Sequence, residues 1–177
     1  MPVLRYTLLA ALVLTASACD SGSDNDTVRR GFVTQISIID APLFKDNGDR
    51  WDGGIIPSGP DIFLEIEGTN GVTLLSTRDI TDADGSSVGV LEDAEAVDFP
   101  FTFVFPDVPD TEFDDLNRVL RVELRDDDGI LGSENMLFTE SFTLDTFAPT
   151  SPGGSSNVRV ESADGTAIVQ LTVDWEN

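Results

Sequence analysis

Apolar residues alternate with polar ones along most of the chain after residue 30. The alternation has a period of two, and β-branched and aromatic residues fill many of its apolar positions, which is typical of β-strands. Clusters of Gly, Pro, Asn and Asp separate the alternating segments, as expected for turns. Eight segments are predicted to be strands: 32–39, 62–67, 72–77, 99–105, 119–125, 137–144, 158–162 and 167–175. The pattern predicts an all-β fold, an eight-stranded antiparallel β-sandwich.

Four of these segments supply a predicted core through every second side chain. Its members are Ile36, Ile38, Ile62, Leu64, Ile66, Leu120, Val122, Leu124, Val169, Leu171 and Val173. Four phenylalanines share the same spacing, at Phe99, Phe101, Phe103 and Phe105. They match either an aromatic binding strip or core positions, and strand spacing favours the core. The segment VLEDAEAV, at 90–97, is expected to form one helical turn at most.

The N-terminus, MPVLRYTLLAALVLTASAC, has a different pattern. One Arg precedes an apolar run, which ends in small residues before Cys19. The run is shorter than the roughly 20 apolar residues of a membrane-spanning helix, and it matches a secretory signal. We therefore expect a signal peptide over residues 1–18, a flexible acidic tether over 19–30 and one sandwich domain over 31–177.

Small residues directly before the chain's single cysteine resemble the lipobox of bacterial lipoproteins. The resemblance implies cleavage before Cys19 and attachment of diacylglycerol to its sulfur, which gives a diacyl or triacyl cysteine with chains such as palmitate. It also implies a lipid-anchored protein of the bacterial cell envelope, on the inner or outer membrane. An ordinary secretory site over residues 16–18, which would leave Cys19 as a free thiol, is the alternative. Exported proteins rarely keep a reactive thiol without a use, which favours lipidation.

The chain is strongly acidic, with 33 Asp and Glu against 10 Lys and Arg and a net charge of -23. This charge argues against a nucleic-acid partner and predicts repulsion from anionic lipid headgroups. An Asp-rich composition with a single lysine, Lys45, is also typical of proteins adapted to high salt. The charge alone is therefore no evidence for a metal site, and the positions of the acids must carry that argument.

Three acidic groups lie next to predicted strands: KDNGDRWDGG at 45–54, Asp61, and RDDDGILGSE at 125–134. Residues just beyond strand ends collect at the rims of a sandwich. A shared rim would bring the three groups together. Hard cations such as Ca²⁺ bind six to eight oxygens, which carboxylates from separate loops can supply. The positions therefore favour a calcium site.

The segment LRVELRDDDGILGSENMLF resembles the later half of a C2 domain, a calcium- and lipid-binding β-sandwich. PDIFLEIE and LTVDWE resemble other strands of that family, so the likeness spans roughly residues 32–176. It implies calcium ligands at Asp61, Asp126, Asp128 and Glu134. Asp46, with Asp49 and Asp52 as substitutes, is the expected first-loop ligand because it follows the first strand.

Other chemistries fit the sequence less well. Neither Gly85 nor Gly129 aligns with the acid pattern of an EF-hand loop. The chain has no histidine, which argues against zinc and against the usual catalytic triads, so we expect no enzyme. The sequence predicts a lipid-anchored, calcium-binding module with an unknown protein or glycan partner. A metal-free structural or interaction lipoprotein is one alternative, and a carboxylate-based hydrolase is another.

Overall fold

The computed structural model describes residue 28 and residues 30–51, 58–81, 84–85, 88–103, 111–127, 135–151 and 153–177. The predicted signal peptide, Cys19 and nearly all of the predicted tether lie outside these residues. No helix in the described part of the chain is both long and apolar enough to cross a membrane.

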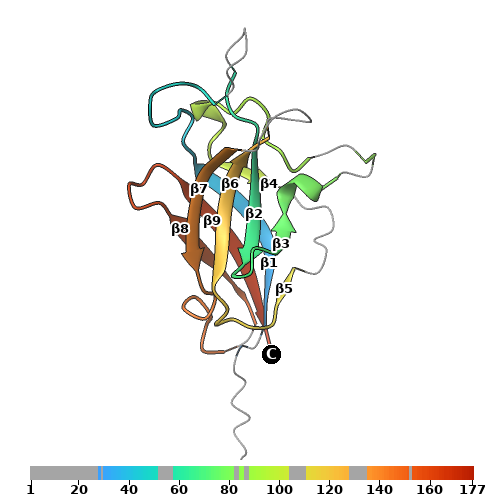
Figure 1. Cartoon of the computed structure of the whole chain (residues 1–177). Coiled ribbons are helices and arrows are strands. Elements are labelled where there is room, and N and C mark those ends of the chain that lie inside the picture. Colours follow the sequence, from blue (N-terminus) through green and yellow to red (C-terminus); the bar gives the residue numbers. More distant parts are fainter. Residues whose placement is uncertain are drawn as a thin grey trace, which may run out of the picture.

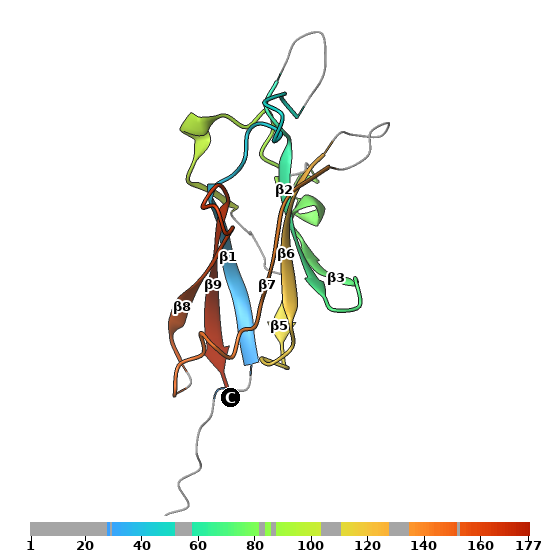
Figure 2. The ribbon, with the colours of Figure 1, turned by 60° about the vertical axis from the view of Figure 1, so that its left-hand side comes forward.

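The described residues form two antiparallel β-sheets that pack face to face (Figures 1 and 2). One sheet has the order β4-β1-β9-β8, with β5 also paired to β1, and the other has the order β3-β2-β6-β7. The strands are β1 (Arg30–Asp40), β2 (Ile62–Gly68), β3 (Thr73–Ser76), β4 (Phe101–Phe103), β5 (Glu112–Phe113), β6 (Leu120–Asp126), β7 (Asn135–Phe142), β8 (Ser155–Glu161) and β9 (Ile168–Glu176). The predicted all-β antiparallel sandwich is confirmed.

The structure has one strand more than the eight predicted, counted over the described residues. This strand, β5, is only two residues long and pairs with Gly31 and Phe32 at the start of β1. Two residues are too few to show an alternating pattern, which explains why the sequence did not predict it. Two 3₁₀ turns, η1 (Thr77–Asp79) and η2 (Ala96–Asp98), complete the described elements. η2 overlaps the end of the segment 90–97, for which one helical turn at most is expected.

The core lies between the two sheets, which Figure 2 shows edge-on. All eleven predicted core residues are no more than 1% exposed. In the phenylalanine series, Phe103 is buried, while Phe99 and Phe101 are partly buried against the core. Phe105 lies outside the described residues. Strand alternation therefore predicted which side chains face inward, and Phe103 is core rather than a binding strip.

Candidate functional site

The start of β2 and the end of β6 lie side by side at one rim, at the upper end of Figure 1. The two strands pair antiparallel, with Ile62 opposite Asp126. The amide of Asp61, one residue before β2, donates to Asp126 Oδ1 over 2.9 Å. The amide of Asp127 donates to the carbonyl oxygen of Asp61 over 2.8 Å. Strand pairing thus brings two of the predicted ligands, Asp61 and Asp126, into direct contact.

The side chain of Asp126 faces the interior. It continues the inward positions of β6 after Leu124, and it is fully buried. Burying a carboxylate is unfavourable unless hydrogen bonds satisfy it. The bond from the Asp61 amide contributes to that requirement and fixes the first residue before β2 against the last residue of β6.

The side chain of Asp61 accepts a hydrogen bond from the backbone of a third acidic residue. The amide of Asp93 donates to Asp61 Oδ1 over 2.7 Å, and Asp93 has a left-handed backbone with a φ of 50°. Nearby, Leu91 and Ile62 exchange two backbone hydrogen bonds of 2.8 Å each. The sequence did not single out Asp93, because it lies in an irregular connection without strand alternation.

Asp127 points away from Asp126, toward the outer face of the sheet. Its Oδ1 accepts from Arg78 Nη2 over 2.9 Å, and the Arg78 guanidinium lies 5.3 Å from the ring centre of Phe63. Phe63 is an outward position of β2 that is nonetheless buried. The alternation of β6 therefore separates the two neighbouring carboxylates.

Among the remaining predicted ligands, Asp46 and its first substitute Asp49 lie in the described loop after β1. Asp46 is exposed in the loop after β1, and it lines a pocket that also includes Asp164. Asp49, its first substitute, accepts from Asn47 Nδ2 over 2.8 Å. Asp52, Asp128 and Glu134 are not among the described residues.

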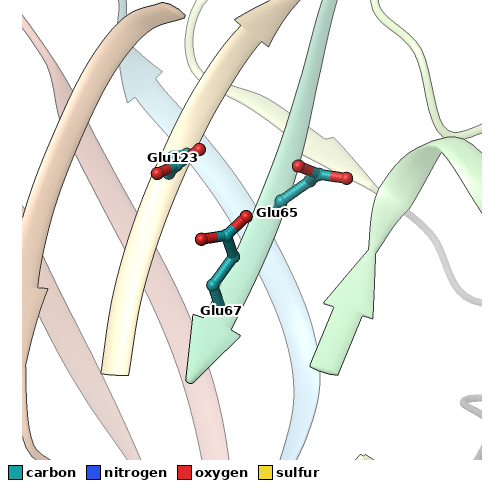
Figure 3. A group of neighbouring side chains, drawn as sticks. All are labelled: Glu65, Glu67 and Glu123. Carbon is teal, nitrogen blue, oxygen red and sulfur yellow. The ribbon is translucent and has the colours of Figure 1, made fainter. Parts of the chain in front are cut away.

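A different acidic group lies on the outer face of β2 and β6. Glu65 and Glu67 project from β2 and Glu123 from β6 (Figure 3). Within the described part of the chain, these three form the only acidic group with ligand oxygens all within 4.8 Å of one another. The sequence analysis assigned the outward positions of these strands no role. Only the pairing of β2 with β6 reveals the group.

Two arginines of β6 supply the cations of this acidic group. Arg125 lies 3.0 Å from Glu65 and 2.5 Å from Glu123, both measured from guanidinium nitrogen to carboxylate oxygen. Arg121 lies 2.9 Å from Glu123 and also pairs with Glu67. The hydrogen bond to Glu67 and the charge of Glu123 raise the pKa of Arg121. A metal ion would have to displace these guanidinium groups, so the arrangement is an ion-pair network.

Asp164, in the turn between β8 and β9, has a lowered pKa. Its Oδ1 accepts from Ser162 Oγ over 2.7 Å, and also from Thr166 Oγ1 over 2.7 Å and the Thr166 amide over 3.0 Å. The Ser162 bond is the largest cause and the Thr166 bonds add to it. Together they lower the pKa of Asp164 from 3.8 to about 2.

We expect an NMR pH titration of the Asp164 carboxyl carbon to give this low pKa. A lowered pKa means that the charged form is favoured by folding, so its stabilisation is complete above pH 3.8 and lost as the pH falls through about 2. Thr166→Val, which removes one hydroxyl donor, should raise the pKa of Asp164. An unshifted pKa in the wild-type protein would contradict the hydrogen-bonded turn.

No family profile matches this sequence, and no curated protein sequence matches it. Among solved structures, human GIVD cytosolic phospholipase A2 in complex with methyl gamma-linolenyl fluorophosphonate aligns with a TM-score of 0.45 and 12% identity. That alignment covers 86% of this chain and 17% of the phospholipase chain. A structure of a C2 domain aligns with a TM-score of 0.40 and 9% identity, over 84% of this chain and 96% of that one.

Scores and identities this low carry no argument about function. The strand pairing itself shows the fold, which consists of two packed antiparallel sheets. Asp61 directly before β2, Asp126 at the end of β6 and Asp93 meet at one rim of this sandwich.

Proposed function

We propose that this chain is a calcium-binding module of the bacterial cell envelope, anchored through a lipid on Cys19. The observation that carries the calcium proposal is the contact at the rim, where Asp126 binds the amide of Asp61 and Asp61 binds the amide of Asp93. These bonds hold acidic residues from three separate segments at one place. The C2 resemblance of the same segments supports the proposal.

The hydrogen bonds between Asp61 and residues 126 and 127 also fix the backbone from which the rest of the acidic segment continues. The Asp127 amide bonds to the Asp61 carbonyl, and Asp128 is the next residue in the chain. Asp128 and Glu134 follow this fixed point, while Asp52 precedes Asp61 in the sequence. Calcium needs several oxygens at about 2.3–2.6 Å. The sequence has further carboxylates before Asp61 and after Asp127 that could supply them. The proposed function is binding, not catalysis.

The calcium proposal predicts opposite behaviour for two neighbouring aspartates. At a calcium concentration about a hundred times the dissociation constant, binding adds about 2.7 kcal/mol to the free energy of unfolding. Asp128→Asn should remove most of this gain, because an amide replaces a charged calcium ligand poorly. In EDTA the same change should be neutral or slightly stabilising, because it removes a like charge.

Asp127→Asn is the matched control in these thermal melts. Its carboxylate faces Arg78, so its loss should lower stability by about 0.2–1 kcal/mol with or without calcium. The calcium-induced gain should therefore remain. An equal loss of the calcium-induced stabilisation in both variants, or no such stabilisation of the wild type, would contradict the calcium proposal. Either result would favour a metal-free interaction lipoprotein.

The anchor is tested separately by Cys19→Ser. We expect the wild-type protein in the membrane fraction of cells and the variant in the soluble fraction, because acyl chains alone would hold the protein there. The unlipidated protein should not bind anionic liposomes, with or without calcium, because its net charge is -23. Retention of Cys19→Ser with membranes would show that the cysteine is not the anchor.

A further inference from the structure

A pocket of about 510 Å³ lies beside the end of β1, the start of β7 and the turn between β8 and β9. The loop after β1, the first residues of β7 and the β8–β9 turn surround it. Its volume is in the range of small-molecule sites, about 300–1,000 Å³. The lining residues that matter for binding are Phe44, Asp46, Trp51, Met136, Asp164 and Thr166. None of the rim residues Asp61, Asp93 or Asp126 lines this pocket.

The first wall is a small, well-bonded hairpin over residues 44–50. Phe44 and Arg50 form an isolated β-bridge, and the amide of Lys45 donates to the Asp49 carbonyl over 2.8 Å. Trp51 follows the hairpin, and its Nε1 donates to the Pro42 carbonyl over 2.8 Å. These bonds fix the backbone at Phe44 and the ring of Trp51 before any ligand arrives, which reduces the entropy lost on binding.

The β8–β9 turn, whose centre is Asp164, also lines the pocket. Ser162 and Thr166 donate three hydrogen bonds to Oδ1 of this carboxylate. Asp164 is exposed, and a charged carboxylate has lone pairs for further donors, so it can also accept a hydrogen bond from a ligand. Asp46 on the first wall is exposed and has no hydrogen-bond partner among the described residues. The pocket lining therefore presents charged acceptors from two separate segments.

The same pocket lining includes exposed apolar surface. Phe44 is 53% exposed and Met136 is 44% exposed, although burial would be favourable for both side chains. A ligand that fits this pocket has an apolar face for the rings and hydroxyl groups for the carboxylates. A sugar ring has both, since its C–H groups form one face and its hydroxyls lie around the edge.

Charge limits which sugars are suitable. Asp46, Asp164 and the net charge of -23 repel anionic ligands. A cationic ligand would meet the protein's own cations, because Lys45 Nζ lies 5.5 Å from the centre of the Trp51 ring and the Arg50 guanidinium 5.7 Å from that of Phe44. We propose that this pocket binds a neutral sugar ring of a glycan.

The proposal goes beyond calcium binding and is tested in EDTA, so either idea can fail alone. The probes are maltohexaose, laminarihexaose, mannohexaose and chitohexaose at millimolar concentration, with oligogalacturonate as the anionic control. Binding is measured by saturation-transfer NMR on the sugars and by tryptophan fluorescence. The chain has two tryptophans, and Trp175 is only 1% exposed, so a ligand should affect Trp51.

We expect at least one neutral oligosaccharide to bind and to protect Trp51 from acrylamide quenching, and oligogalacturonate not to bind. Phe44→Ala should weaken binding about tenfold, because it removes the most exposed ring of the pocket. Asp46→Ala should also weaken it, and both residues are exposed enough for the fold to tolerate the change. Val72→Ala, at an exposed site outside the pocket, should leave affinity unchanged.

Three results would overturn the proposal. The first is no binding by any of the four neutral sugars at millimolar concentration. The second is equal binding of oligogalacturonate, which would mean that the acidic walls do not select the ligand. The third is sugar binding that Phe44→Ala leaves unchanged, which would place the sugar elsewhere.

Discussion

Arg125→Met is expected to destabilise the protein by about 3 kcal/mol, because it removes a cation shared by the buried Glu123 and the partly buried Glu65. The side chain of Glu123 is 0% exposed. Arg125 lies 2.5 Å from Glu123 and 3.0 Å from Glu65. Breaking a buried ion pair by removing one partner typically costs about 3–5 kcal/mol. We take the lower value because Arg121 still contacts Glu123. The free energy of unfolding of small domains is about 5–15 kcal/mol, so this cost is a large fraction of the total stability.

The matched control is Arg159→Met, which removes an arginine from an exposed pair on β8. Arg159 and Glu161 are 3.1 Å apart, with side chains 50% and 46% exposed, so the loss should be about 0–1 kcal/mol. The double variant Glu123→Leu/Arg125→Met should be more stable than Arg125→Met, because no buried charge is left unpaired. Urea unfolding in EDTA measures all four proteins. Equal costs for the two single arginine variants would contradict the buried network.

Gly89→Ala is expected to cost more than about 3 kcal/mol, through a clash with backbone. A Cβ at Gly89 would overlap the carbonyl group of Thr77. Thr77 is fully buried; its hydroxyl donates to the Gly89 carbonyl over 2.7 Å and accepts from the Leu64 amide over 2.9 Å. Moving residue 89 away would disrupt these bonds. Overpacking costs about 1–3 kcal/mol, and a buried group left unsatisfied costs about 1–3 kcal/mol more.

Gly68→Ala separates this clash from a general effect of adding a methyl group. A Cβ at Gly68 would meet the end of the Arg118 side chain, which can move aside. We expect a change of less than about 1 kcal/mol. Thermal unfolding of both variants is the measurement. A Gly89→Ala protein as stable as Gly68→Ala would show that Thr77 and Gly89 do not pack as described.

The strands were predictable because half-buried strands impose a period of two on the sequence. Ile62, Leu64 and Ile66 show this pattern without interruption, and all three are fully buried. The contact of Asp61 with Asp126 was also within reach, since both residues border strong strands. The antiparallel pairing of β2 with β6, with Ile62 opposite Asp126, is what establishes this contact.

Other parts of the site depend on long-range pairing that a single sequence does not encode locally. Asp46 follows the first strand as expected, yet the hairpin of residues 44–50 places it in a pocket with Asp164. The Glu65, Glu67 and Glu123 group depends on which strands are neighbours in the sheet. Alternation predicts only that these side chains face outward. It does not predict that two arginines accompany them.

The most direct test of the calcium proposal is a backbone amide NMR titration with calcium, starting from the protein in EDTA. We predict that the largest shifts fall on the amides of Asp61, Asp93 and Asp127, which form the hydrogen bonds of the rim. Glu65, Glu67 and Glu123 should shift little, because arginines already neutralise them. No shifts, or shifts centred on those three glutamates, would contradict a calcium site at the rim.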